Sequence, residues 1–167
     1  MMKGILALVF SFFVLTACQY KVPITTVHNI PVEHHVLGAW KIIPAENEND
    51  DTHIRIFKFS DTEYTVHYLE DGGDLYFRAY IIDIAGITAV QLELIGTDDG
   101  PVAVAENDRY QVVSYQLENG LLKISTLNSD LVDDELSDSE SLRNAFIHNK
   151  NNPELFNDPG VFERISD

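Results

Sequence analysis

The chain of 167 residues has little cysteine, tryptophan or positive charge, with only Cys18 and Trp40 as the single members of their types. One cysteine cannot form a disulfide within the chain, so no internal cross-link stabilises the fold. Eleven lysines and arginines face 27 aspartates and glutamates, which gives a formal net charge of −16. This charge opposes binding to nucleic acid or to anionic lipid headgroups. We expect no nucleic-acid partner.

Motifs for metal binding and for nucleophilic catalysis are also missing. The adjacent His34 and His35 point to opposite faces if they are extended, and no histidine spacing matches a zinc site. The acidic segments 46–51 and 130–140 lack the regular ligand alternation of a calcium loop. No Gly-x-Ser-x-Gly sequence occurs. We therefore expect no metal, no cofactor and no enzyme, although a carboxylate pair for hydrolysis stays open because its separation is spatial.

The first residues combine one positive charge with a short apolar run. Lys3 precedes the nearly uninterrupted apolar segment 4–16, and the sequence Leu-Thr-Ala-Cys ends at Cys18. A membrane-spanning helix needs about 20 apolar residues, so the run is too short to cross a bilayer. A positive start, a short apolar core and a small residue before the cleavage point are typical of a removable export signal. Residues 1–17 are therefore predicted to be a signal peptide.

This segment resembles the signal peptide and lipobox of bacterial lipoproteins. The resemblance implies cleavage before Cys18 and attachment of three acyl chains to that residue, which would anchor the protein to a lipid bilayer. In Gram-negative lipoproteins, a residue other than Asp after the cysteine implies transport to the outer membrane, and here that residue is Gln19. Residues 18–36 contain two prolines and no sustained period, so we predict a tether that lifts the domain off the membrane.

From residue 37 onward the pattern is that of a β domain, predicted to span 37–167. Segments rich in Val, Ile, Tyr and Phe recur about every 8–12 residues between turn residues, which is typical of an antiparallel sandwich or barrel. The predicted strands are 37–43, 52–59, 63–70, 75–84 and 87–95, followed by a hairpin over 110–127. Asn119-Gly120 suits a two-residue type I′ turn, which pairs Glu118 with Leu121 and Tyr115 with Ile124.

One helix and one strand are expected near the end of the chain. Ser137 and Glu140 have the spacing of a capping box. Leu142, Ala145 and Phe146 then fall on one face of the predicted helix, which residues 149–153 end. A final strand over 161–165 would close the sheet.

Gly38 and Trp40, in the predicted strand 37–43, resemble the Gly-x-Trp element that opens lipocalins and related calycin barrels. In that family the tryptophan plugs one end of the barrel and a late arginine packs over it, a role for which Arg164 is the candidate here. The resemblance implies a fold that is mainly β, a single antiparallel barrel of about eight strands with one short helix near the C-terminus. The family's second motif, Thr-Asp-Tyr, is absent.

Four tyrosines in the predicted strands, Tyr64, Tyr68, Tyr80 and Tyr115, are candidates for ligand binding. Tyrosine lining a barrel mouth would suit a small amphipathic molecule, whereas the same residues could simply pack the core. The leading hypothesis is a non-enzymatic, membrane-anchored envelope accessory that binds a partner protein or a small apolar ligand. The alternatives are a small-ligand carrier of lipocalin type and a hydrolase that uses a carboxylate pair.

Overall fold

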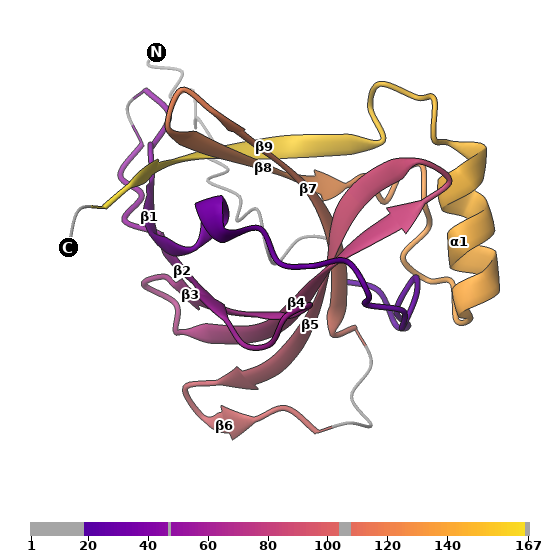
Figure 1. Ribbon diagram of the computed structural model, residues 1–167, viewed down its shortest axis with the longest axis horizontal. Helices are drawn as coiled ribbons and strands as arrows, with labels where there is room; N and C mark the ends of the chain where they lie inside the picture. Colours follow the sequence, from indigo (N-terminus) through magenta and orange to yellow (C-terminus); the bar gives the residue numbers. More distant parts are fainter. Residues whose placement is uncertain (1–18, 47, 104–107, 166–167) are drawn as a thin grey trace, which may run out of the picture.

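A closed antiparallel barrel forms the body of the protein (Figure 1). The computed structural model describes residues 19–46, 48–103 and 108–165. Strands that follow one another along the chain are paired, except that β7 pairs with β5 and not with β6, and β9 returns to pair with β1, which closes a ring of eight strands. The elements are η1 (His34–Val36), β1 (Gly38–Ile42), β2 (His53–Lys58), β3 (Tyr64–Leu69), β4 (Leu75–Ile84), β5 (Ile87–Thr97), β6 (Gly100–Pro101), β7 (Tyr110–Glu118), β8 (Leu121–Leu127), α1 (Ser139–His148) and β9 (Phe156–Arg164). The short β6 pairs only with the end of β5.

The fold class predicted from the sequence is confirmed: mainly β, one eight-stranded barrel and one helix near the C-terminus. The register of the β7–β8 hairpin is also as predicted. Glu118 faces Leu121 and Tyr115 faces Ile124 across the turn. Asn119 and Gly120 both have positive φ, at 52° and 80°, as a type I′ turn requires. None of the helices in the described part of the chain is long and apolar enough to span a bilayer.

Alternation along the strands places one set of apolar side chains inside the barrel. On β3, every second residue is buried, and the same period recurs on β8. The interior set is continuous from β1 round to β9. Its largest fully buried members are Trp40, Tyr68, Phe77 and Phe162.

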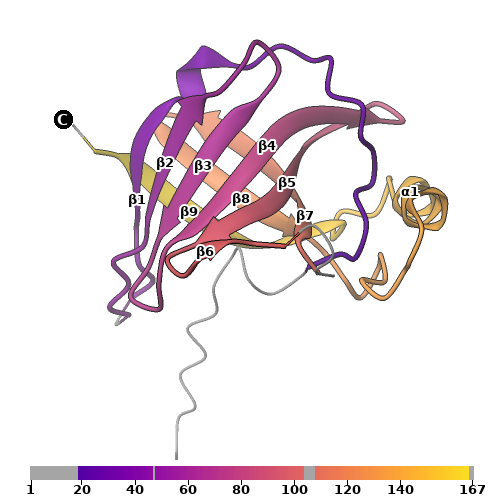
Figure 2. The ribbon, with the colours of Figure 1, turned by 90° about the horizontal axis from the view of Figure 1, so that it is seen from below.

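The segment predicted to be a tether packs against the barrel instead. Tyr20 pairs with Tyr110 through two backbone hydrogen bonds, and Tyr20 and Ile24 are fully buried. They join a second apolar cluster outside the barrel, which includes Leu142 and Phe146 of α1. Figure 2 shows α1 on the outside of the barrel. Val32 and Val36, farther along, cover one end of the barrel. The tether prediction was wrong for residues 20–36, because contacts with distant strands bury apolar residues that show no local period.

Two element boundaries also differ from the prediction. The cap of α1 is Asp138 rather than Ser137, because the Asp138 carboxylate accepts a hydrogen bond from the Ser141 backbone N–H at 2.8 Å. The predicted buried face is correct, with Leu142 and Phe146 fully buried. β9 begins at Phe156 rather than at 161, and it continues past Asp158, whose φ of 49° marks an irregularity in the pairing with β8.

Candidate functional site

The interior of the barrel is mostly filled by side chains. An apolar cavity of about 60 Å³ lies inside the barrel, and two of the tyrosines named above, Tyr64 and Tyr115, contribute to its wall together with aliphatic side chains such as Leu92 and Val113. Sites for drug-sized ligands usually have volumes of about 300–1,000 Å³. The barrel therefore holds too little space for such a ligand in this conformation.

Glu33 holds the N-terminal segment across one end of this cavity. Its backbone N–H donates a hydrogen bond to the Tyr64 hydroxyl at 2.5 Å, and its carboxylate lies near enough to the Tyr115 hydroxyl to influence its pKa. Burial and the Glu33 carboxylate together raise the pKa of Tyr115, while burial raises the pKa of Tyr64. Both hydroxyls therefore stay protonated at neutral pH. The helix η1, which follows Glu33, lies over this end of the barrel (Figure 2). Sequence reasoning missed Glu33, because nothing local marks it.

The three residues of the Gly-x-Trp resemblance lie together at the same end. Trp40 and Arg164 are cross-strand partners on β1 and β9, and the Arg164 guanidinium carbon lies 4.2 Å from the centroid of the Trp40 ring. Arg164 also donates hydrogen bonds to the carbonyl oxygens of His35 and Leu37, both at 2.7 Å. Gly38 leaves room for this arginine, since a Cβ there would lie 2.6 Å from Nη1. This arrangement fixes η1 to the strands.

The other two candidate tyrosines do not line the cavity. Tyr68 is buried elsewhere in the barrel interior, in the same cluster as Trp40 and Phe77. Tyr80 lies in the outer apolar cluster, where its hydroxyl donates to the Thr25 carbonyl at 2.8 Å. Burial raises the pKa of Tyr80 to about 12. The four tyrosines therefore do not form one site.

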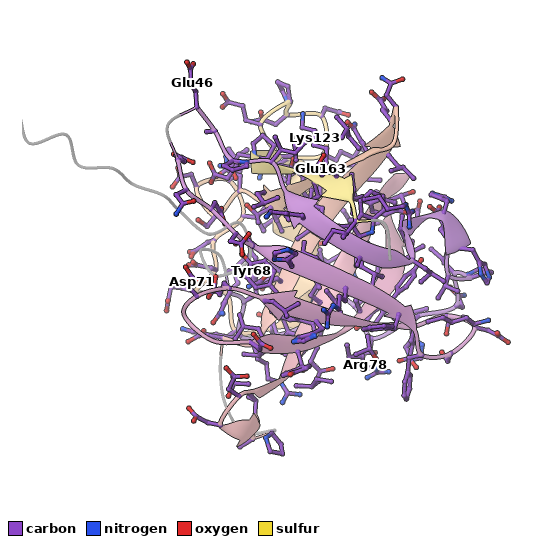
Figure 3. The ribbon with its side chains drawn as sticks, turned by 90° about the vertical axis from the view of Figure 1, so that its left-hand side faces the viewer. Glu46, Tyr68, Asp71, Arg78, Lys123 and Glu163 are labelled. Carbon is purple, nitrogen blue, oxygen red and sulfur yellow. The ribbon has the colours of Figure 1, made fainter. Side chains whose placement is uncertain are left out.

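Two carboxylates on the outer face, Glu63 and Glu93, form ion pairs with arginines and do not form a carboxylate pair with each other. Arg78 on β4, labelled in Figure 3, donates a hydrogen bond from Nε to Glu63 at 2.5 Å and lies 3.6 Å from Glu93 on β5. Glu93 also pairs with Arg109. Burial opposes ionisation of Glu63, but the hydrogen bond and charge of Arg78 outweigh it and lower its pKa. A carboxylate held ionised in this way is a poor general acid.

Glu70 has the opposite environment. Burial, followed by the nearby charge of Asp50, raises the pKa of its carboxyl group. One of its oxygens is buried without a hydrogen-bond partner. This combination weakens the folded state when Glu70 is ionised.

A shallow groove of about 380 Å³ lies on the outer face of β1 and β2. Gly38 and Ala39 form its low part, and His53, Arg55 and Phe57 are among the side chains around it. Phe57 is 53% exposed, and Phe59, farther along the chain, is 70% exposed. No carboxylate among the described residues lies within 4.0 Å of the Arg55 guanidinium. Alternation predicts that Arg55 and Phe57 face outward, but it gives no reason to single them out as a site.

Comparison with known proteins leaves the function open. No protein-family model, curated protein or solved structure significantly matches this chain. The described residues contain no group of three or more His, Cys, Asp or Glu side chains that could hold a metal ion. The closed eight-stranded barrel is consistent with a lipocalin-like fold. Cys18 and the predicted signal peptide lie outside the described residues.

Proposed function

We propose that this protein is a non-enzymatic accessory of the bacterial envelope, anchored through acylated Cys18, whose barrel is a scaffold for docking a partner protein. The observation that carries the docking role is the pair of exposed phenylalanines, Phe57 and Phe59, beside an outer groove. The anchor depends on the lipobox sequence and the apolar leader. The outer membrane of a Gram-negative cell is the proposed location, given Gln19.

Packing supports docking on the outside rather than inside. Large side chains such as Trp40 and Phe77 occupy the barrel, and the remaining 60 Å³ is small for a carried molecule. Phe57, by contrast, exposes an aromatic ring to water on the outer face of β2, beside Arg55. Exposed aromatic side chains are enriched in protein–protein interfaces.

Charge indicates what kind of partner the groove suits. Arg55 is a cation without a carboxylate partner among the described residues of a strongly acidic chain, and His53 lies nearby around the same groove. Guanidinium groups bind carboxylates through two parallel hydrogen bonds. A partner segment that places a carboxylate at Arg55 and an apolar side chain against Phe57 fits this surface.

Photo-crosslinking in the native host tests the docking role. A photoreactive amino acid at position 57 should give one discrete protein adduct, and the substitution Arg55→Glu should abolish it. The same probe at Leu121, which is 38% exposed on β8, is the matched control and should give no such adduct. An adduct that survives Arg55→Glu, or no adduct, would contradict docking through this groove.

Mass spectrometry of the protein from its native host tests the anchor separately. The expected product begins at Cys18 and carries three acyl chains. A chain that retains residues 1–17, or an unmodified Cys18, would disprove the anchor without bearing on the groove.

A carrier of one small apolar molecule is the second candidate, favoured by the cavity that Glu33 covers. Movement of this segment would widen the space beside Tyr64 and Tyr115. N-phenyl-1-naphthylamine fluorescence should then rise with wild-type protein and more strongly with Glu33→Ala, and Val113→Phe should reduce it. Equal fluorescence in all three proteins would exclude the carrier.

A further inference from the structure

A second outer groove lies over the polar face of the β7–β8 hairpin. It has a volume of about 450 Å³ and is called the hairpin groove below. Its floor includes two cross-strand pairs, Gln116 with Lys123 and Ser114 with Ser125. These four polar side chains line the outside of the same hairpin whose apolar residues pack the barrel interior. The hairpin groove lies across the hairpin from the interior cavity, with Tyr115 contributing to both, and it shares no lining residue with the groove beside Phe57.

Two lysines give the hairpin groove its electrostatic character. Lys123 comes from β8, and Lys150 comes from the turn after α1. Neither ammonium group lies within 4.0 Å of a carboxylate among the described residues, and no carboxylate lines the groove. Glu163, labelled with Lys123 in Figure 3, lies on the neighbouring strand two residues from Val161, the cross-strand partner of Lys123. In a chain with a net charge of −16, two unneutralised lysines in one groove favour an anionic ligand.

The remaining lining suits a hydroxyl-rich molecule. Ser114 and Ser125 offer hydroxyls that both donate and accept hydrogen bonds, and Gln116 and Asn152 offer amides that do the same. Phe156 adds an aromatic side chain. A sugar ring presents hydroxyls around its edge and C–H groups on its face, so it matches this mixture. The groove volume is within the usual range for small-molecule sites.

We propose that the hairpin groove binds an anionic saccharide. Lys123 and Lys150 hold the acidic group, while the hydroxyl and amide side chains of the floor bind the sugar hydroxyls. The acid is a carboxylate or a phosphate, since an ammonium group binds either as a point charge. This site depends neither on the lipid anchor nor on a protein partner.

Titration calorimetry of the full chain in detergent tests the proposal with four probes: glucose 6-phosphate, glucuronate, glucose and inorganic phosphate. Both acidic sugars should bind with a Kd of about 1 mM or below, and glucose should bind at least about tenfold more weakly. The stronger acidic sugar identifies the preferred acid. Inorganic phosphate should bind more weakly than glucose 6-phosphate, because it lacks the hydroxyls that the floor recognises.

Variants connect this binding to the named residues. Lys123→Gln with Lys150→Gln should weaken both acidic sugars by about tenfold or more. Ser114→Ala with Ser125→Ala should weaken the sugars and leave inorganic phosphate unchanged. Lys58→Gln is the matched control, since Lys58 pairs with Asp61 in a turn remote from the groove and should leave every affinity unchanged. Unchanged Tm values show that each variant is folded.

Three results would overturn the proposal. These are no heat from either acidic sugar at about 10 mM, acidic-sugar affinities unaltered in the folded double-lysine variant, and inorganic phosphate binding as tightly as glucose 6-phosphate. A loss of partner crosslinking at position 57 would leave these measurements untouched, so the two proposals fail independently.

Discussion

Arg164 lies over the ring of Trp40, with 4.2 Å between the guanidinium carbon and the ring centroid. The two residues face each other on β9 and β1, the pair of strands that completes the barrel. Because the same guanidinium donates to two carbonyl oxygens near η1, one side chain joins the barrel seam to the segment covering its end. Gly38 makes this possible by leaving space for Nη1.

Gly38→Ala should therefore destabilise the protein by about 1–3 kcal/mol, because the new methyl group meets Arg164 and the backbone φ of +124° disfavours a side chain. Urea unfolding measures the effect. Gly120→Ala is the control: its φ is also positive, at +80°, but no atom lies within 4 Å of the added Cβ. Equal decreases in the free energy of unfolding for the two variants would show that the contact with Arg164 does not contribute to the destabilisation.

Asp138→Ala should lower the Tm by about 2–4 °C, since it removes the acceptor for the Ser141 N–H at the start of α1. Ser137→Ala should leave the Tm unchanged, because Ser137 does not cap the helix. Thermal unfolding followed by circular dichroism compares the two. A larger decrease in Tm for Ser137→Ala would show that Ser137 caps the helix, as expected from the sequence.

Glu70→Gln should stabilise the protein at neutral pH and have little effect in acid. The pKa of Glu70 is raised by burial and by Asp50, so the folded state prefers the protonated carboxyl. Its favourable contribution is complete below the unfolded pKa and disappears as the pH rises through the folded pKa. Urea unfolding across this range measures the effect, with the exposed Glu118→Gln as control. Stabilisation by Glu70→Gln that is the same at every pH would contradict the raised pKa.

Ile24→Ala should cost about 2–5 kcal/mol, because Ile24 is fully buried beneath α1. Val27→Ala, three residues later, should cost little, since Val27 is 61% exposed. Chemical denaturation of both variants tests whether the N-terminal segment is part of the cooperative fold. Equal, small effects would show that this segment is a tether outside the cooperative fold.

Local signals explain which parts of the fold the sequence could predict. The β7–β8 register follows from Asn119-Gly120 and strict alternation, both of which are local. The packing of Tyr20 and Ile24 could not be predicted, since their partners, Tyr110 and Gln91, lie far along the chain. The start of β9 was missed because Asp158 and the proline after it are typical of a turn.

The candidate sites were less predictable than the fold. Tyr64 and Tyr115 do meet at one cavity, but a tyrosine on a strand has the same sequence signature whether it faces a cavity, as these do, or an outer cluster, as Tyr80 does. Arg55 and Lys123 stand out only once the structure shows that neither forms an ion pair with a carboxylate in the described part of the chain. Their significance depends on neighbours distant in sequence.

The burial of Tyr20 bears on how the domain would sit at a membrane. If Cys18 carries the acyl chains, only Gln19 separates that residue from the first buried side chain. An extended residue spans at most about 3.6 Å, so the lipid attachment point would lie within a few ångströms of the barrel. The barrel would then rest directly against the headgroups, with the edge formed by Tyr20 and Tyr110 nearest the lipid and its tilt dictated by the chain. A strongly acidic body held so close would also be sensitive to the surface charge of the leaflet.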